Sequence, residues 1–369
     1  MKILLVAGAR PNFMKIAPII RAIKKHNNHR QSSIVNFQYL LVHTGQHYDY
    51  DMSKVFFEDF TIPEPDYFLN VGSWSHAQQT AKIMIAFEKV CLEEKPDIVV
   101  VVGDVNSTLS CSITSKKLNI KVAHVEAGLR SGDMTMPEEI NRIVTDSISD
   151  FLFVTEKSGI ENLKSEGKKE DQIFFVGNTM IDTLLYSLEK LKRMKLPGIN
   201  RSKYAIVTLH RPSNVDNKEK LKGILTALME ISRDMDIYFP IHPRTEKNIK
   251  NYGLTNLIED SNIKTMPPKS YLKFLALWKD ASLVLTDSGG LQEETTALGI
   301  PCFTIRDNTE RPVTIKEGTN KLVGAKRDTI MDAYSSFKNG VSKKRRIPEL
   351  WDGKAAERIV DVLYKPGKL

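Results

Sequence analysis

The sequence has little cysteine and no long apolar run. Its 369 residues include only three cysteines, Cys91, Cys111 and Cys302, at wide spacings. Such spacing fits neither a disulfide framework nor a cysteine-rich zinc site, so we interpret the thiols as buried side chains in a reducing compartment, the cytoplasm. No window approaches the ~18 uninterrupted apolar residues of a membrane span. The N-terminal MKILLVAGAR lacks the long apolar stretch of a secretory signal and is interpreted as a first strand.

Charge of one sign is only slightly in excess. Lysine and arginine number 53 against 45 aspartate and glutamate residues, a net charge of +8. That excess fits an acidic small molecule, a nucleic acid or no particular partner. The one dense basic run, at 343–346, contains no aromatic residue, so we interpret it as a solvated segment, with nucleic-acid or membrane contact as the lesser alternative. We expect neither a nucleic acid nor a membrane as partner.

Short β-branched runs alternate with longer amphipathic segments, and the alternation begins again near the middle of the chain. In the first half we expect strands near 3–6, 39–42, 98–102, 122–125 and 151–154, and helices near 78–94, 107–117 and 137–148. In the second half we expect strands near 204–208, 236–241, 254–258, 282–286 and 301–305. This pattern predicts an α/β protein with two Rossmann-like doubly wound domains. In such pairs the ligand sits in a cleft between the domains, at the carboxyl ends of the strands.

Acidic residues stand at three points of the first half where strands end or a helix begins. Asp104 follows the expected strand at 98–102, Glu126 follows the strand at 122–125, and Glu138 lies in the first turn of a helix opened by Pro137. The carboxyl ends of parallel strands meet at one edge of a sheet, so these carboxylates should converge there. Such a cluster suits removal and return of a proton at carbon. For Glu138 alone, helix capping is the alternative.

The loop after the first strand carries two cations. Arg10 and Lys15 flank the start of the first helix, where the helix dipole already presents positive charge, so a bound anion would stabilise the arrangement. Pairing of both cations with local acids is the alternative. The loop does not read GxGxxG, which argues against a dinucleotide cofactor.

The second half places anion-binding residue types at its strand ends. His210 and His242 each follow a strand and are closely followed by arginine, which indicates an edge that faces an anion. Ser288, Gly289 and Gly290 lie between a strand and a helix, where backbone N–H groups can approach a phosphate closely. The acids that follow can accept hydrogen bonds from a ribose. Together these residues indicate a nucleoside diphosphate bound by the second domain.

The order of these segments is more specific than any one of them. The chain contains Gly8-Ala9-Arg10-Pro11 with Lys15, Gly103-Asp104, His124-Val125-Glu126-Ala127-Gly128-Leu129-Arg130, Pro137-Glu138-Glu139 with Arg142, His210-Arg211, Asp287-Ser288-Gly289-Gly290 with Gln292-Glu293-Glu294, Glu310-Arg311-Pro312 and Asp352-Gly353-Lys354-Ala355. Over nearly its whole length it resembles the UDP-N-acetylglucosamine 2-epimerases of the non-hydrolysing type.

The resemblance implies a glycosyltransferase-B-like architecture. It implies an N-terminal domain over 1–177 with the acid/base residues, a UDP-binding domain over 178–351, and a C-terminal helix over 352–369 that crosses back to the first domain. It also implies inversion at C2 of the sugar, through anti elimination of UDP to a 2-acetamidoglucal and re-addition of UDP. No nicotinamide or metal cofactor is implied, and the partner is a UDP-sugar. We further expect a homodimer.

The resemblance also implies roles for single residues. The catalytic set would be Asp104, Glu126 and Glu138 as acid/base carboxylates and His210 beside the leaving diphosphate. The substrate-binding set would be Arg10, Lys15, Arg142, His242, Ser288, Gly289, Gly290 and Arg311, with Glu294 at the ribose and Phe274 at the uracil.

Two alternatives stay open within the same fold. The family often reads Gly-Thr-Arg-Pro-Glu near the start, whereas this chain reads Gly-Ala-Arg-Pro-Asn at 8–12. That variant also resembles the branch that acts on UDP-2,3-diacetamido-2,3-dideoxy-glucuronate. A hydrolysing 2-epimerase is the other alternative, and the absence of His-x-x-Gly-Gly-Glu at 124–128 argues against it.

Overall fold

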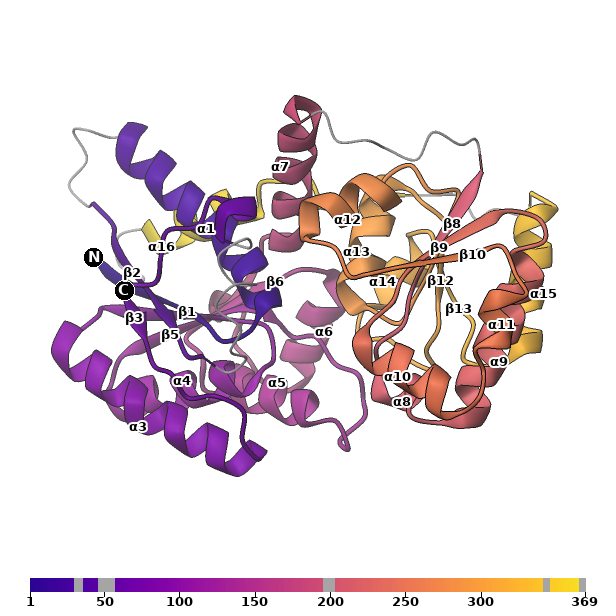
Figure 1. Ribbon diagram of the computed structural model, residues 1–369. Coiled ribbons are helices and arrows are strands. Elements are labelled where there is room, and N and C mark those ends of the chain that lie inside the picture. The colour runs from indigo at the N-terminus through magenta and orange to yellow at the C-terminus, as the bar shows by residue number, and fades with distance from the viewer. Residues whose placement is uncertain (30–35, 46–56, 195–202, 341–345, 365–369) are drawn as a thin grey trace. The chain divides into compact units, whose positions relative to one another are not determined.

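The computed structural model describes residues 1–29, 36–45, 57–194, 203–340 and 346–364 (Figure 1). The chain divides into two compact units, Met1–Tyr186 with Glu349–Leu369, and Ser187–Pro348. The boundary between Tyr186 and Ser187 falls inside helix α7 (Thr179–Arg193). The start of α7 belongs to the first unit because Thr183 donates a hydrogen bond to the Met14 carbonyl, at 2.5 Å. Of the basic run at 343–346, only Arg346 lies within the described residues.

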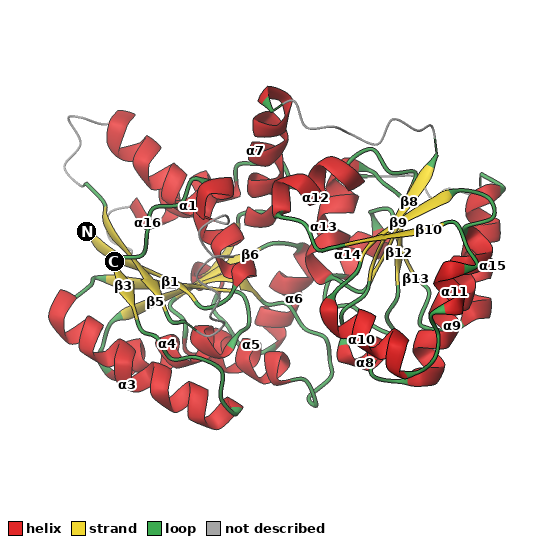
Figure 2. Cartoon of the chain, in the orientation of Figure 1, coloured by secondary structure: helices red, strands yellow, loops and turns green. Residues whose placement is uncertain are grey.

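The first unit is built on a seven-stranded parallel sheet with the order β3-β2-β1-β4-β5-β6-β7. Its strands are β1 (Lys2–Ala7), β2 (Gln38–His43), β3 (Tyr67–Phe68), β4 (Ile98–Val102), β5 (Lys121–Ala127), β6 (Phe151–Val154) and β7 (Ile173–Phe175). Helix α1 (Arg10–His29) covers one face, and α3 (His76–Glu94), α4 (Asn106–Lys117) and α5 (Pro137–Ile148) cover the other, while α6 (Lys157–Ser165) and a short 3-10 turn (Glu170–Gln172) lead to β7 (Figures 1 and 2).

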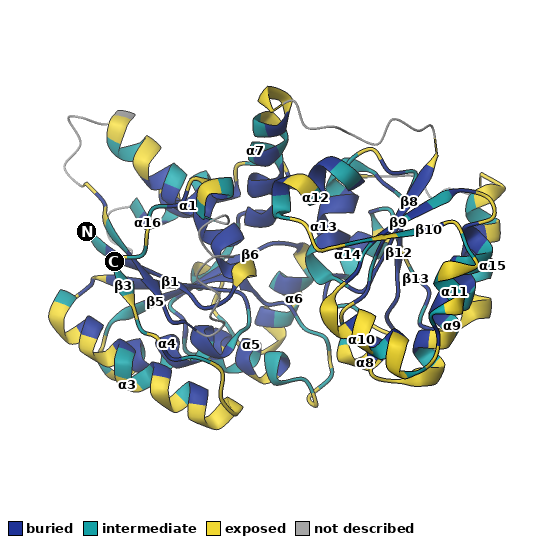
Figure 3. Ribbon diagram, in the orientation of Figure 1, coloured by how far each residue is buried: buried dark blue, intermediate teal, exposed yellow. Residues whose placement is uncertain are grey.

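Burial explains why these strands could be predicted. All five residues of β4 are buried, as expected for a parallel strand between two layers of helices. On one face, Leu4, Val99 and Val101 pack with Ile83 and Phe87 of α3. Figure 3 shows the strands mostly in the buried class and the outer faces of the helices exposed. The strands expected near 3–6, 39–42, 98–102, 122–125 and 151–154 are therefore confirmed.

The second unit repeats the architecture with a six-stranded parallel sheet of order β10-β9-β8-β11-β12-β13. Its strands are β8 (Tyr204–Thr208), β9 (Asp236–Pro240), β10 (Ile263–Met266), β11 (Leu283–Thr286), β12 (Cys302–Thr304) and β13 (Asn320–Leu322). Its helices are α8 (Pro212–Val215), α9 (Lys218–Ile231), α10 (Pro243–Asn251), α11 (Asn256–Glu259), α12 (Tyr271–Trp278), α13 (Gly289–Leu298), α14 (Pro312–Lys316) and α15 (Arg327–Lys338). The strand order reverses between β1 and β4 in the first sheet and between β8 and β11 in the second. Ligands of open α/β sheets bind at the carboxyl ends of the strands beside such a reversal.

The prediction of a strand at 254–258 is wrong. Residues 254–258 contain the start of helix α11, and the edge strand is β10 further along the chain. Leu254, Leu257 and Ile258 stand at helical spacing, and all three pack on the core of the second unit. In so short an apolar run, periodicity alone does not distinguish a strand from a helix.

The end of the chain returns to the first unit. Helix α16 (Ala355–Tyr364) packs on α1, and Lys25 forms an ion pair with Glu357 at 2.5 Å. Asp182 of α7 accepts hydrogen bonds from the N–H groups of Ala355 and Ala356, at 3.1 and 2.7 Å, which caps the helix start. Trp351 donates to the Thr155 carbonyl at 3.0 Å.

The three cysteines are free and buried, as the sequence indicated. Within the described ranges, no helix combines the length and the apolar character that crossing a membrane requires.

Candidate active site

Two carboxylates stand at neighbouring strand ends of the first unit. Strands β4 and β5 pair in parallel, with Val102 opposite Val125, so Asp104 and Glu126 belong to the same edge of the sheet. Glu126 has a φ of 74°, which is uncommon for a residue with a side chain. The β5–β6 register also shifts between Val125 and Ala127. Bulges and strained backbone of this kind occur next to active sites, where they re-aim a side chain.

Glu126 is paired with a cation inside the first unit. Its Oε2 and the Lys15 Nζ form an ion pair, and the two side chains are only 3% and 8% exposed. Gly103 lies against this pair with a φ of 69°, and a Cβ there would come within 2.9 Å of the Lys15 Nζ. The positive φ and the close approach of Lys15 both favour glycine at this position.

The two cations predicted to bind an anion behave differently. Lys15 pairs with Glu126, an acid 111 positions along the chain, whereas the alternative drawn from the sequence was pairing of both cations with local acids. Arg10 is exposed at the start of α1 and makes no ion pair with a described residue. Asn12 fixes the loop between β1 and α1, because its side-chain oxygen accepts from the N–H groups of Gly8 and Ala9 at 3.1 and 2.9 Å. Its amide nitrogen donates to the Val102 carbonyl at 2.9 Å, which ties the loop to β4.

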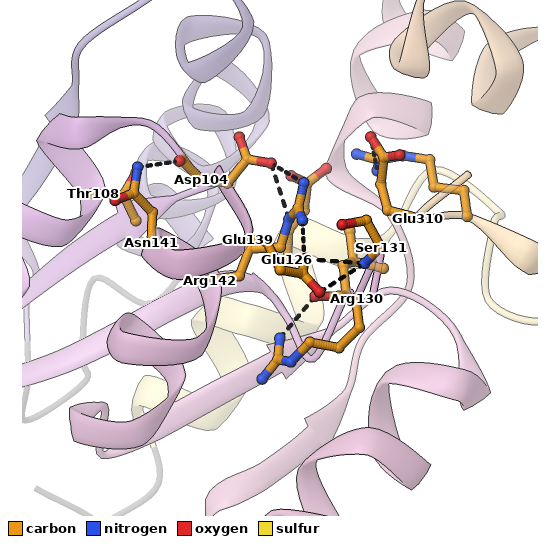
Figure 4. Close-up of polar contacts among 12 residues, drawn as sticks. Asp104, Thr108, Glu126, Arg130, Ser131, Glu139, Asn141, Arg142 and Glu310 are labelled. Atoms are coloured by element: carbon orange, nitrogen blue, oxygen red, sulfur yellow. Dashed lines mark hydrogen bonds and ion pairs between the residues drawn. The ribbon is translucent and has the colours of Figure 1, made fainter. Parts of the chain in front are cut away.

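Asp104 is held by a buried arginine (Figure 4). The Arg142 Nε and Nη2 lie 3.1 and 2.9 Å from the Asp104 Oδ2, and the Arg142 Nη1 forms an ion pair with Glu139. Glu139 also accepts hydrogen bonds from the N–H groups of Ser131 and Gly132, at 3.0 and 2.9 Å. Burial alone would raise the pKa of Glu139, but these hydrogen bonds and Arg142 outweigh it and lower that pKa. Arg142, which we expected to bind substrate, thus connects Asp104 to Glu139.

Sequence reasoning missed Glu139. The neighbouring residue, Glu138, is half-buried in the first turn of α5 and has no ion-pair partner among the described residues. Glu139 and Arg142 are three residues apart on a helix, a spacing that brings side chains together. That spacing was the available signal for the Glu139 network.

The second unit holds its two histidines at the ends of β8 and β9. The His210 Nδ1 lies 2.8 Å from the Asp287 Oδ1, and Asp287 is fully buried. Burial alone would raise the pKa of Asp287, but His210 and the N–H groups of His210 and Arg211 outweigh it and lower that pKa. The His242 Nδ1 accepts from the Arg244 N–H at 3.2 Å, and its ring centroid lies 6.3 Å from that of His210. Burial first, and then the charges of His210 and Arg244, lower the pKa of His242.

The predicted phosphate turn joins β11 to α13. Ser288 precedes the helix, and its N–H donates to the Thr286 Oγ1 at 2.9 Å, while Gly289 and Gly290 form the first helical turn. The amides of such a turn are available to an anion because they have no partner within the helix.

Arg311 lies in a buried cluster of charges. Its Nε is 2.6 Å from the Glu293 Oε1, and its neighbour Glu310 forms an ion pair with Arg306 at 2.8 Å. Burial alone would raise the pKa of Glu310, but Arg311 and Arg306 outweigh it and hold that pKa well below its usual range.

The predicted ribose and uracil residues lie on neighbouring elements of the second unit. The Tyr271 hydroxyl donates a hydrogen bond to the Glu294 Oε1, where Glu294 is buried and Tyr271 is half-buried. Burial first, and the nearby charge of Glu293 as well, raise the pKa of Glu294 to about 8, although the Tyr271 hydrogen bond opposes the shift. Phe274 stands one turn after Tyr271 on α12 and is half-buried.

The described residues contain no group of three or more His, Cys, Asp or Glu side chains that could hold a metal ion. Within the first unit the structure brings together Lys15 with Glu126 and Asp104 with Arg142. Within the second it brings together His210 with His242 and Tyr271 with Glu294.

Two Rossmann-like parallel sheets with polar residues at their strand ends define an α/β protein of the glycosyltransferase-B type. The family model described as UDP-N-acetylglucosamine 2-epimerase matches residues 29–364. A UDP-N-acetylglucosamine 2-epimerase of Methanocaldococcus jannaschii is 45% identical over an alignment of 373 positions, which covers 98% of this chain and 99% of that protein. The chain belongs to the UDP-N-acetylglucosamine 2-epimerase family, a family of isomerases.

Further relatives and solved structures agree with this assignment. A UDP-2,3-diacetamido-2,3-dideoxy-D-glucuronate 2-epimerase of Pseudomonas aeruginosa is 39% identical, in an alignment that covers 99% of this chain and 100% of that protein. The crystal structure of the M. jannaschii enzyme with UDP-GlcNAc and UDP has a TM-score of 0.86 at 44% identity, covering 98% of this chain and 99% of that one. The Neisseria meningitidis enzyme bound to UDP-GlcNAc has a TM-score of 0.87 at 31% identity, with the same coverage. The predicted family and fold class are confirmed.

Proposed function

We propose that the chain interconverts UDP-N-acetylglucosamine (UDP-GlcNAc) and UDP-N-acetylmannosamine by inversion at C2. The observation that supports this proposal is the pair of carboxylates, Asp104 and Glu126, at the ends of adjacent strands β4 and β5 in a member of this family. Each carboxylate has a basic partner within the first unit, Arg142 and Lys15 respectively. Two carboxylates in different electrostatic surroundings can act as the base that removes a proton from carbon and the acid that returns one.

The reaction would proceed by anti elimination and re-addition. A carboxylate takes the C2 proton while the C1–oxygen bond breaks, and UDP leaves with the bonding electrons to give 2-acetamidoglucal. UDP then re-adds at C1 while an acid delivers a proton to the other face of C2. Asp104, Glu126 and Glu138 would supply the acid and base, with Arg142 and Glu139 holding Asp104 in place.

The second unit would hold the UDP. Ser288, the amides of Gly289 and Gly290, and Arg311 would bind the phosphates. Glu294 would accept hydrogen bonds from the ribose, and Phe274 would contact the uracil. The remaining cationic or histidine side chains would stabilise the charge that develops on the leaving diphosphate, namely Arg10, Lys15, His210 and His242.

Product analysis tests the reaction type. Purified protein incubated with UDP-GlcNAc should give a stable mixture of the two UDP-sugars in proton and phosphorus NMR spectra. The phosphorus spectrum should keep the diphosphate-sugar signals and show no accumulation of free UDP. Accumulation of UDP with free N-acetylmannosamine would contradict the proposal and place the chain with the hydrolysing enzymes.

A second substrate is favoured by one local feature. Asn12 stands where the family often has glutamate, and a relative at 39% identity is named for UDP-2,3-diacetamido-2,3-dideoxy-D-glucuronate. The same assay with both UDP-sugars at equal concentration decides between them. Turnover of the diacetamido-glucuronate nucleotide alone would retain the mechanism and change the substrate.

We also propose a cytoplasmic homodimer that works without a metal or nicotinamide. The buried free thiols support a reducing compartment. Light scattering coupled to size exclusion should give twice the chain mass of 41.8 kDa. Activity should survive dialysis against a chelator, and a monomeric mass or a metal requirement would contradict the respective part of this proposal.

A further inference from the structure

His124 is a fully buried histidine with hydrogen-bonding partners on both ring nitrogens. It lies in β5, two residues before Glu126. Its Nε2 is 2.8 Å from the Gly103 carbonyl oxygen, and its Nδ1 is 2.6 Å from the Asp146 Oδ1 of helix α5. The proposed chemistry makes no use of this residue.

The partners of His124 determine its charge state. A carbonyl oxygen only accepts, so the Nε2 must carry a proton. Asp146 is held as an ionised carboxylate, because its Oδ2 forms an ion pair with the Arg130 Nη1 at 2.8 Å and accepts from the Gly128 N–H at 2.9 Å. The ionised carboxylate cannot donate, so the Nδ1 must carry a proton too.

These hydrogen bonds fix the backbone just before Asp104 and just after Glu126. The Gly103 N–H donates to the Val125 carbonyl at 3.0 Å, and its carbonyl accepts from His124, so the residue before Asp104 is held at both of its polar groups. Asp146 holds Gly128, just after the bulge that contains Glu126. A residue such as Glu126, with a φ of 74°, keeps that conformation only where its surroundings over-determine it.

We infer that His124, as an imidazolium paired with Asp146, is a positioning residue that sets the geometry of Asp104 and Glu126 for proton transfer at C2. The role rests on the proposed epimerase function. It does not require His124 to touch the substrate, because it acts through the backbone of Gly103 and Gly128. Misplacement of reacting groups by about 1 Å can cost about 100-fold in rate, so a positioning defect should appear in kcat.

Nitrogen NMR of the wild-type protein tests the charge state without any substitution. With 15N-labelled histidine at pH 7, the spectrum should contain the signal of a ring with both nitrogens protonated. That signal should disappear in His124→Gln. A His124 ring with one unprotonated nitrogen would overturn the inference.

A matched pair of substitutions separates positioning from stability. Asp146, in helix α5, holds the end of β5. Asp150, just after α5, holds the start of β5, because it accepts from the Val122 N–H at 2.8 Å and from Lys116. Asp146→Asn should lower kcat by about 100-fold and leave UDP affinity unchanged, because the phosphates are assigned to the other unit. Asp150→Asn loses the same kind of bond at the opposite end of the strand and should keep kcat. Equal losses of kcat in the two variants would overturn the inference.

Two replacements of His124 test its role through the Gly103 carbonyl independently. His124→Gln keeps an amide donor that can reach the Gly103 carbonyl, whereas His124→Leu keeps none, so kcat should fall less in the first variant at similar KM. Equal kcat in both would contradict a role through Gly103. If the wild-type protein shows the imidazolium signal but no epimerisation of either UDP-sugar, the proposed function fails. The positioning role then fails with it, while the charge state of His124 stands.

Discussion

Replacing Lys15 with methionine should destabilise the first unit and abolish turnover. The Lys15 and Glu126 side chains are 8% and 3% exposed, so the substitution leaves the Glu126 carboxylate without its cation where water is largely excluded. Removing one partner of a buried ion pair costs about 3–5 kcal/mol, because the remaining charge stays desolvated. We therefore expect a loss of this size in the free energy of unfolding. Methionine preserves most of the side-chain volume, so packing contributes little to the loss.

Urea denaturation of the purified variants measures this loss. Lys25→Met is the matched control, because Lys25 lies on the same helix and pairs with Glu357, but these side chains are 59% and 44% exposed. An exposed pair contributes about 1 kcal/mol or less, so the control should unfold close to the wild type. The double variant Lys15→Met/Glu126→Gln removes both charges and should recover most of the stability. It should remain inactive because the carboxylate is gone.

Two results would refute this reasoning. Lys15→Met could unfold at the wild-type urea midpoint, which would mean that Glu126 is satisfied without the lysine. Alternatively, the double variant could be no more stable than Lys15→Met alone. In that case the loss would come from packing around α1 and not from an uncompensated charge.

Three further predictions test other parts of the site. Asp104→Asn and Glu138→Gln should each lose at least about 100-fold in kcat, the low end for a general acid or base. Nearly full activity of Glu138→Gln would show that this residue only complements the start of its helix. Gly289→Val should abolish UDP binding in calorimetry and leave the melting temperature of the free protein unchanged, since a Cβ there lies at an ordinary 3.5 Å from the Glu310 Oε1. Retained UDP affinity would contradict a phosphate site at this turn. Burial raises the pKa of Glu294 from 4.5 to about 8, so its protonated form favours the folded state, and stability is fully present below pH 4.5 and lost as pH rises through about 8. Glu294→Gln should flatten this decline in melting temperature, and an unchanged pH profile would show that the group titrates normally.

Most of the fold follows from local sequence. Strands such as β4 are covered by helices on both faces, so they appear as continuous β-branched runs that need no knowledge of the rest of the chain. The short edge strands β3, β7 and β13 contain two or three residues each and carry too little pattern to predict. Helix α11 was mistaken for a strand because a run of that length has no decisive periodicity.

The candidate site was predictable in its residue types and not in its pairings. Asp104 and Glu126 could be found because strand ends in a parallel sheet share an edge. The pairing of Lys15 with Glu126 joins residues 111 positions apart and depends on how α1 packs on the sheet. The sequence also cannot tell which of Glu138 and Glu139 turns inward, since that depends on the rotation of α5 about its own axis.

Proton NMR of the wild-type protein with UDP-GlcNAc in deuterated water tests the central claim most directly, because acid/base chemistry at C2 must exchange the proton on that carbon. The C2 proton signal should disappear from the product UDP-N-acetylmannosamine and, as the reaction reverses, from the remaining UDP-GlcNAc. Asp104→Asn and Glu126→Gln should slow both losses by the same factor as turnover. Formation of UDP-N-acetylmannosamine with the C2 proton retained would contradict proton transfer with solvent-exchangeable carboxylates at C2.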